Sequence, residues 1–457
     1  MKNKIFLVAG IIVAVVISAC VTETAEKDTE ITIYNQNFGV VKETREIELE
    51  KGMSTVMIQD VAKLIDPTSV SITDLTASTA VLEQNYLYDL VSKEKIYEKY
   101  TGKEISLTDK NGDTIKGTLL SYSGDELVIQ NDDGVHILKA EEVSLPTLPE
   151  GLITKPTLQW LLDTDRGGDH NIQLSYITSG LNWKADYVAV VNNDDSALDL
   201  TSWVTLDNRT GASYKNAKLK LIAGDVHRVE ETDRNYPEVA EEKAGAPAAP
   251  HFEEESFFEY HMYTLQRTTD VLNNQQKQVT LFETDDVTVE KEYVFDTGWY
   301  SYYYGSSGES VIKTMLSFEN VEENNMGMPL PKGTVKVYKK DSEGQLQFIG
   351  EDSIDHTPKD EKIRIYLGDA FDLVGEKKQT DYERIGDDAS ETGYEVTLRN
   401  HKDEDVTITV IGHLWGDWTM TDSSHDWEKE DANTVVWHIN VPEDGETTLT
   451  YTVRVEW

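Results

Sequence analysis

Apolar and polar residues alternate along most of the chain, and short apolar runs end at Gly, Asn, Asp or Pro. Strand side chains repeat with a period of two, whereas an amphipathic helix repeats every 3.6 residues, and almost no stretch shows the helical period. Regularly spaced strands with turn residues between them predict an all-β chain of antiparallel β-sandwich domains. The clearest alternating segments are 30–34, 44–49, 54–58, 171–176, 217–222, 334–338, 362–367, 395–398, 406–411, 434–439 and 447–455.

Residues 95–149 hold the most compact part of this pattern. Five short alternating runs lie there, and Asn111-Gly112 is a dipeptide that two-residue hairpin turns favour. We predict a small SH3-like or Sm-like barrel, inserted into an N-terminal β-sandwich region that covers 30–94 and 150–229. Such barrels can bind nucleic acid, but the many acids of this one favour a structural insertion.

A change of composition marks the next boundary. Residues 230–256 carry Glu, Ala and Pro in place of an apolar period, and such a segment buries too little apolar surface to order itself. We therefore predict a flexible acidic Ala/Pro linker there. Connecting strands are expected over 257–286, and an immunoglobulin-like antiparallel β-sandwich over 287–457.

The N-terminus has the layout of an export signal. A basic start and an uncharged apolar run lead to the small-residue sequence Ile-Ser-Ala-Cys at 17–20, and the run is shorter than the roughly 20 apolar residues of a transmembrane helix. We predict that 1–19 form a lipoprotein signal peptide, that Cys20 is lipidated, and that 20–29 form a tether. The protein would then be anchored to the outer face of the cell membrane or lie in the cell envelope. The alternative is a plain secretory signal or an uncleaved anchor.

Charge narrows the choice of partners. The chain carries 84 acidic and 42 Lys or Arg residues, a net charge of −42, which repels phosphate backbones and anionic headgroups. We therefore expect no nucleic-acid partner, and contact with the membrane only through the lipid on Cys20. Because Cys20 is the only cysteine, no disulfide forms within one chain, so hydrophobic cores have to stabilise the fold.

Several longer phrases carry a resemblance to a known family. They are Tyr34–Gln36, Phe38–Val41, Ile65–Val70, Leu181–Tyr187, Ala217–Val226, Met328–Gly333 and Gly368–Gly375. Together they resemble a domain-of-unknown-function family of exported β-sandwich proteins related to the C-terminal domain of mucoidy-inhibitor-like proteins. The resemblance implies an exported, largely β protein of uncharacterised activity, and it carries over no catalytic residue.

Motifs for catalysis are absent from the sequence, and the leads for a metal are weak. There is no Gly-x-Ser-x-Gly, Walker loop, dinucleotide fingerprint or His-Glu-x-x-His. Four histidines near the C-terminus are weak zinc candidates, but successive hairpin strands explain their spacing equally well, so no metal site is predicted. Acid-rich loops are interpreted as solvated turns, which leaves weak calcium binding as the alternative and no cofactor predicted. The histidines are His401, His413, His425 and His438, and the loops are 163–169, 192–195, 352–360 and 422–431.

Two further patterns are candidate sites. An aromatic segment bounded by glycines suits stacking on sugar rings or contact with a partner protein, although a strand end that covers a sheet would look the same. Asn208 begins an Asn-x-Thr glycosylation sequence. The aromatic residues are Trp299, Tyr300, Tyr302, Tyr303 and Tyr304.

The function that these features favour is a non-enzymatic binding or scaffolding protein of the cell envelope, anchored by lipid, with an envelope protein or glycan as partner. The alternative is a hydrolase of envelope polymers that uses acidic residues or a metal.

Overall fold

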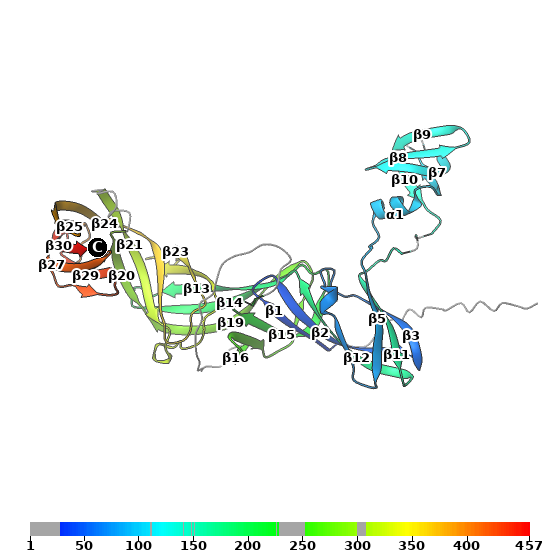
Figure 1. Cartoon of the computed structure of the whole chain (residues 1–457), viewed down its shortest axis with the longest axis horizontal. Helices are drawn as coiled ribbons and strands as arrows, with labels where there is room; N and C mark the ends of the chain where they lie inside the picture. The colour runs from blue at the N-terminus through cyan, green and yellow to red at the C-terminus, as the bar shows by residue number, and fades with distance from the viewer. Residues whose placement is uncertain are drawn as a thin grey trace, which may run out of the picture. The chain divides into compact units, whose positions relative to one another are not determined.

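The structure, a computed structural model, describes residues 28–109, 112–139, 141–147, 149, 151–224, 226–227, 252–298 and 308–457. Nearly all regular structure in these ranges is β, mostly in antiparallel sheets, which confirms the predicted all-β class (Figure 1). Two compact units can be distinguished. The first contains 207–219, 267–275 and the residues up to Asn182, and the second contains 183–206, 220–266 and 276–457. Among the described residues no helix is long and apolar enough to span a bilayer.

The first unit contains one larger and one smaller antiparallel sheet. In the larger sheet the strand order is β15-β1-β2-β12-β4, with β18 paired to β15, and in the smaller sheet it is β3-β11-β5. A 3-10 turn at Pro67–Ser69 is capped by the side chain of Asp66. The strands are β1 (Asp28–Tyr34), β2 (Phe38–Leu49), β3 (Gly52–Gln59), β4 (Ser71–Asp74), β5 (Thr79–Leu87), β11 (Thr157–Thr164), β12 (Gly168–Ser179), β15 (Tyr214–Ala223) and β18 (Thr269–Val271).

The predicted small barrel is a helix followed by a five-stranded antiparallel sheet of order β10-β6-β7-β8-β9 (cyan in Figure 1). Helix α1 (Lys93–Tyr100) is capped by Ser92, whose hydroxyl accepts a hydrogen bond from the Lys95 amide. The helix buries Tyr97 and Tyr100. The sequence pattern missed this helix because two turns are too short to show a period of 3.6. The strands are β6 (Glu104–Thr108), β7 (Thr114–Ser123), β8 (Glu126–Asn131), β9 (Gly134–Lys139) and β10 (Glu142–Ser144).

A five-stranded sheet of order β19-β14-β13-β22-β23 begins the second unit. Here β13 and β22 run parallel, with Ala185 opposite Gly333. A Cβ at Gly333 would lie 2.4 Å from the carbonyl oxygen of Ala185, so only glycine permits this approach. The strands are β13 (Leu181–Val191), β14 (Ala197–Asn208), β19 (Gln275–Thr288), β22 (Gly333–Lys340) and β23 (Leu346–Ile354).

A hairpin of β16 (Phe252–Phe257) and β17 (Tyr260–Leu265) pairs with the end of β15, where Lys220 lies opposite Thr264. Phe252 is fully buried. The strand therefore starts inside the segment predicted as a linker, because an acid-rich strand with few apolar residues does not stand out from linker composition. The predicted linker residues 230–251 lie outside the described residues.

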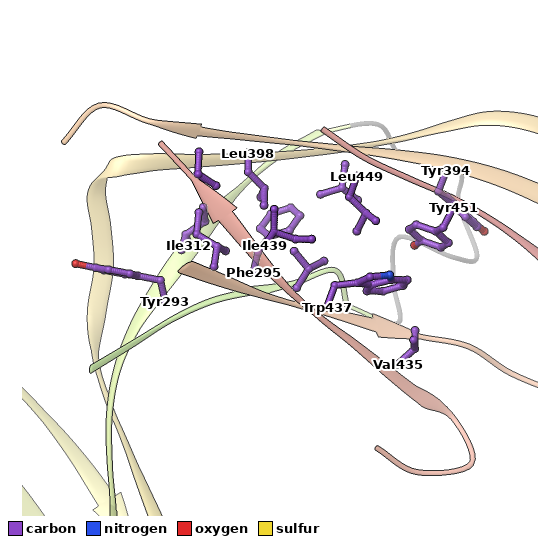
Figure 2. Packing of buried hydrophobic residues seen from close by; sticks show 14 of the residues in the cluster. Tyr293, Phe295, Ile312, Tyr394, Leu398, Val435, Trp437, Ile439, Leu449 and Tyr451 are labelled. Atoms are coloured by element: carbon purple, nitrogen blue, oxygen red, sulfur yellow. The ribbon is translucent and has the colours of Figure 1, made fainter. Parts of the chain in front are cut away.

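The C-terminal part forms a nine-stranded sheet of order β27-β30-β25-β24-β21-β20-β26-β29-β28, closed over one hydrophobic core. Figure 2 shows the core side chains between two layers of ribbon, with Trp437 and Tyr451 side by side. Below, the C-terminal sandwich means these nine strands. They are β20 (Glu290–Asp296), β21 (Gly308–Glu319), β24 (Lys362–Ile385), β25 (Ala389–Asn400), β26 (Val406–His413), β27 (Asp417–Ser423), β28 (Glu428–Lys429), β29 (Thr434–Val441) and β30 (Gly445–Glu456), and a 3-10 turn at Glu322–Asn324 follows β21.

Candidate functional site

A pocket of about 290 Å³ in the second unit gathers charged side chains from distant parts of the chain. Its charged lining consists of Lys291 on β20, Lys339 on β22, Asp195 from the turn between β13 and β14, and Asp369 on β24. Apolar walls come from β13, β21, β23 and β24. We call this the lysine pocket.

The turn that carries Asp195 is shaped by side-chain caps. The Asn192 side-chain oxygen accepts hydrogen bonds from the backbone amides of Ser196 and Ala197 at 3.0 and 3.2 Å. Asp195 has a φ of 60°, a left-handed conformation that Asp and Asn tolerate better than most residues. The predicted acid-rich loop at 192–195 is thus a turn, and it directs one carboxylate to two lysines.

Asp195 bridges the two ammonium groups of the lysine pocket. Lys291 Nζ lies 2.8 Å from Asp195 Oδ2, and Lys339 Nζ contacts Asp195 Oδ1. The three side chains are 24–32% exposed, so they are partly shielded but accessible from solvent.

Electrostatics keep Asp195 and Lys291 ionised. Burial disfavours the charged form of Asp195, but hydrogen bonds and charge from the two lysines outweigh it and hold the pKa of the carboxyl below its usual value. Burial also opposes the charge on Lys291, while Asp195 and Tyr293 favour it, and the pKa of the amine is raised. Groups whose pKa values move away from neutrality are poor general acids and bases, so the cluster is suited to holding charge.

The rim of the pocket carries a second carboxylate. Asp369 is exposed, and its Oδ1 accepts a hydrogen bond from the Tyr366 hydroxyl at 2.8 Å. Leu316, Ile349 and Leu367 contribute apolar surface to the same pocket. The lysine pocket therefore combines cationic, anionic and apolar surface, as small-molecule sites do.

A buried amine forms a second unusual feature. Lys377, on β24, is 8% exposed. Its Nζ lies 4.6 Å from the centroid of the Tyr394 ring and donates a hydrogen bond to Thr297 Oγ1 at 3.3 Å. Burial lowers the pKa of this amine to about 8, although the charge of Asp296 acts in the opposite direction.

This amine predicts a pH dependence of stability. Because the folded-state pKa lies below that of a free lysine, the unfolded chain binds more protons between the two values, and stability rises with pH in that window. We expect the free energy of unfolding of the wild type, measured in urea, to rise by about 2 kcal/mol from pH 8 to pH 10 relative to that of Lys377→Met. Lys378→Met removes an exposed neighbour and should keep the gain. Equal pH profiles for wild type and Lys377→Met would contradict the prediction.

The four candidate histidines do not converge. His413 Nε2 lies 2.9 Å from Asp296 Oδ1, while His438 Nδ1 lies 3.2 Å from Thr409 Oγ1. The other two lie in the turns after β25 and β27, and they are His401 and His425. Over the described ranges, no group of three or more His, Cys, Asp or Glu residues is placed to hold a metal ion.

Asn208 of the glycosylation sequence is fully buried. Its side-chain nitrogen donates hydrogen bonds to the carbonyl oxygens of Ala212 and Val271 at 2.9 and 3.0 Å. A glycan would take the place of one of these hydrogens, in a position without open space around it. Glycosylation at this residue would therefore have to precede folding or disrupt the turn.

Two predicted sites lie outside the described residues: Cys20, and the aromatic segment from Trp299 to Tyr304. Sequence analysis did not single out Lys291, Lys339 or Lys377. Lys377 alternates in phase with the buried Leu373, and a lysine in a core-facing position was the one signal that could have marked it.

The folds of the two units and the lysine pocket define an all-β sandwich protein with a candidate ligand site. Residues 172–457 match the family described as a domain of unknown function (DUF4139). Because the match covers more than half of the sequence, the chain belongs to this family. No curated protein matches the sequence.

Proposed function

We propose that this chain is a lipid-anchored, non-enzymatic binding or scaffolding protein of the cell envelope, related to mucoidy-inhibitor-like proteins. The lysine pocket is the observation that carries the proposal. Asp195 and Lys291 hold each other in their charged forms, which favours recognition of a charged ligand over transfer of protons.

The N-terminal sequence supports the location. The signal ends in Ile-Ser-Ala-Cys, which places Cys20 directly after a small-residue cleavage site, as a lipid anchor on this residue requires. The chain would then be held at the outer face of the membrane, and its net charge of −42 would keep the folded part hydrated and away from anionic headgroups.

In-cell chemical cross-linking followed by mass spectrometry tests this function. We expect the wild type to fractionate with membranes and to cross-link to one or two envelope components, and Cys20→Ala to appear in the soluble fraction. Metal analysis and hydrolysis assays on envelope polymers run beside it. Turnover of a polymer, or no cross-linked partner together with a tightly bound ion, would favour the hydrolase instead.

A further inference from the structure

We propose that the lysine pocket binds a small zwitterion of the amino-acid class, with its carboxylate on Lys291 and Lys339 and its ammonium group at Asp369. This inference rests on the proposed binding function and names the chemistry of the ligand. Nothing in the family description assigns a ligand to this chain.

The cationic end has donors to spare. An ammonium group has three N–H donors, and Lys339 donates one of them to Asp195. Lys291 likewise donates one to Asp195, and the Tyr293 hydroxyl is its other polar neighbour. N–H groups of both lysines thus remain for a carboxylate, and charge-assisted hydrogen bonds of this kind are among the strong ones.

The anionic end has an acceptor to spare. Tyr366 donates its hydroxyl hydrogen to Oδ1 of Asp369, which orients the carboxylate. Among the described residues no hydrogen bond or ion pair to Asp369 Oδ2 is found, so this oxygen can accept from a ligand ammonium. Positive and negative ligand groups therefore both find partners in one pocket.

Size and apolar surface restrict the ligand further. Ligand pockets have volumes of roughly 300 to 1,000 Å³, so a pocket of about 290 Å³ suits one small molecule. Leu316, Ile349 and Leu367 can contact an aliphatic side chain. A free amino acid, or the end of a short peptide, fits this description better than a segment of a polymer.

Charge balance favours the zwitterion over simpler ions. A carboxylic acid without an amine would leave the negative charge of Asp369 unpaired by the ligand. An amine without a carboxylate would place a positive charge near the two lysines and offer them no negative partner. A ligand charge placed beside a like charge of the pocket is repelled at short range, and specificity arises from that penalty against the wrong ligand.

Titration calorimetry with the detergent-solubilised full chain tests the inference, with L- and D-leucine, 4-methylpentanoate (leucine without its amine) and 3-methylbutylamine (leucine without its carboxylate) as probes. We expect at least one leucine enantiomer to bind, and both truncated probes to bind about 10-fold more weakly or worse. Failure of both enantiomers to bind at concentrations up to about 10 mM, which corresponds to a binding free energy of only about −2.7 kcal/mol, would overturn the inference.

Matched variants locate the site. Lys339→Met should lower the affinity for leucine about 10-fold, and Lys339→Arg should restore part of it. Asp369→Asn should lower the affinity for leucine but leave the affinity for 4-methylpentanoate unchanged or higher. A purely structural role of Asp369 would not produce this difference between the two ligands. Lys336→Met is the control, because it changes an exposed lysine on the same strand, and it should bind leucine with the affinity of the wild type.

The outcomes separate the two proposals. If leucine binds equally well to Lys339→Met and to the wild type, the zwitterion site is wrong. If the pocket takes no amino acid while in-cell cross-linking still captures an envelope partner, only this inference fails. If cross-linking also captures no partner, the proposed function fails with it.

Discussion

Replacing Trp437 by alanine should lower the free energy of unfolding of the C-terminal sandwich by about 4 kcal/mol, the middle of the range for large aromatic residues in cores. Trp437 is fully buried in that core, and its ring centroid lies 4.6 Å from that of Tyr451 (Figure 2). Removal of the indole leaves a cavity that the surrounding strands cannot close.

The neighbours explain why little relaxation is expected. A Cβ at Gly412, on the strand beside Trp437, would lie 2.9 Å from the indole ring, so the ring occupies the space that the glycine leaves open. The indole nitrogen also donates a hydrogen bond to Ser423 Oγ at 3.2 Å. Trp437→Ala therefore loses ring packing on two sides and one hydrogen bond.

Hydrogen exchange with urea titration is the appropriate measurement because the chain has two units and need not unfold in one step. In Trp437→Ala, the protection of backbone amides from exchange should fall over β29 and β30 and stay unchanged over β1 and β2. Phe371→Ala is the control, since that side chain is 96% exposed and its loss should change stability by less than about 0.5 kcal/mol. A loss below about 1 kcal/mol for Trp437→Ala would mean that the core rearranges around the gap.

The second large effect is expected in the first unit, where Arg45→Met should cost about 4 kcal/mol. Arg45 and Glu43 are 4% and 3% exposed, and the Arg45 guanidinium donates to Glu43 Oε2 from Nε at 2.9 Å. It also donates to the carbonyl oxygen of Gln59 at 2.7 Å. Methionine fills similar space but leaves the buried carboxylate without its counter-ion.

A double variant separates charge from packing. Glu43→Leu with Arg45→Met removes both charges at once, and replacement of a whole buried pair by apolar residues is often nearly neutral. We expect the double variant to recover at least half of the stability lost by Arg45→Met, with Lys42→Met, exposed on the same strand, as the unchanged control. Equal losses for the single and double variants would show that packing or the bond to Gln59 dominates.

Periodicity predicted the strands well because burial on one face is a local property of the sequence. Trp183 and Tyr187 alternate with polar residues in the sequence, and they are 2% and 1% exposed on β13. Glu43 and Arg45 also lie in phase with apolar neighbours on β2, so alternation places both on one buried face, but it does not say that the two side chains form an ion pair.

The candidate site could not be predicted in the same way. Lys291, Lys339 and Asp195 lie on three segments that meet only through the pairing of strands, and alternation does not say which strands are neighbours. The parallel pairing of β13 with β22 is the clearest case, since no hairpin turn links the two strands and nothing in either one identifies the other.

The parallel pairing of β13 with β22 also has consequences for folding and for truncation of the chain. The partner of Ala185 on β22 is Gly333, about 150 residues later, so β13 lacks this neighbour until a distant part of the chain has folded. During this time β13 presents unpaired backbone groups, the surface on which chains join edge to edge. A chain truncated before Gly333 would keep this edge of β13 exposed permanently, so we expect the truncated chain to aggregate.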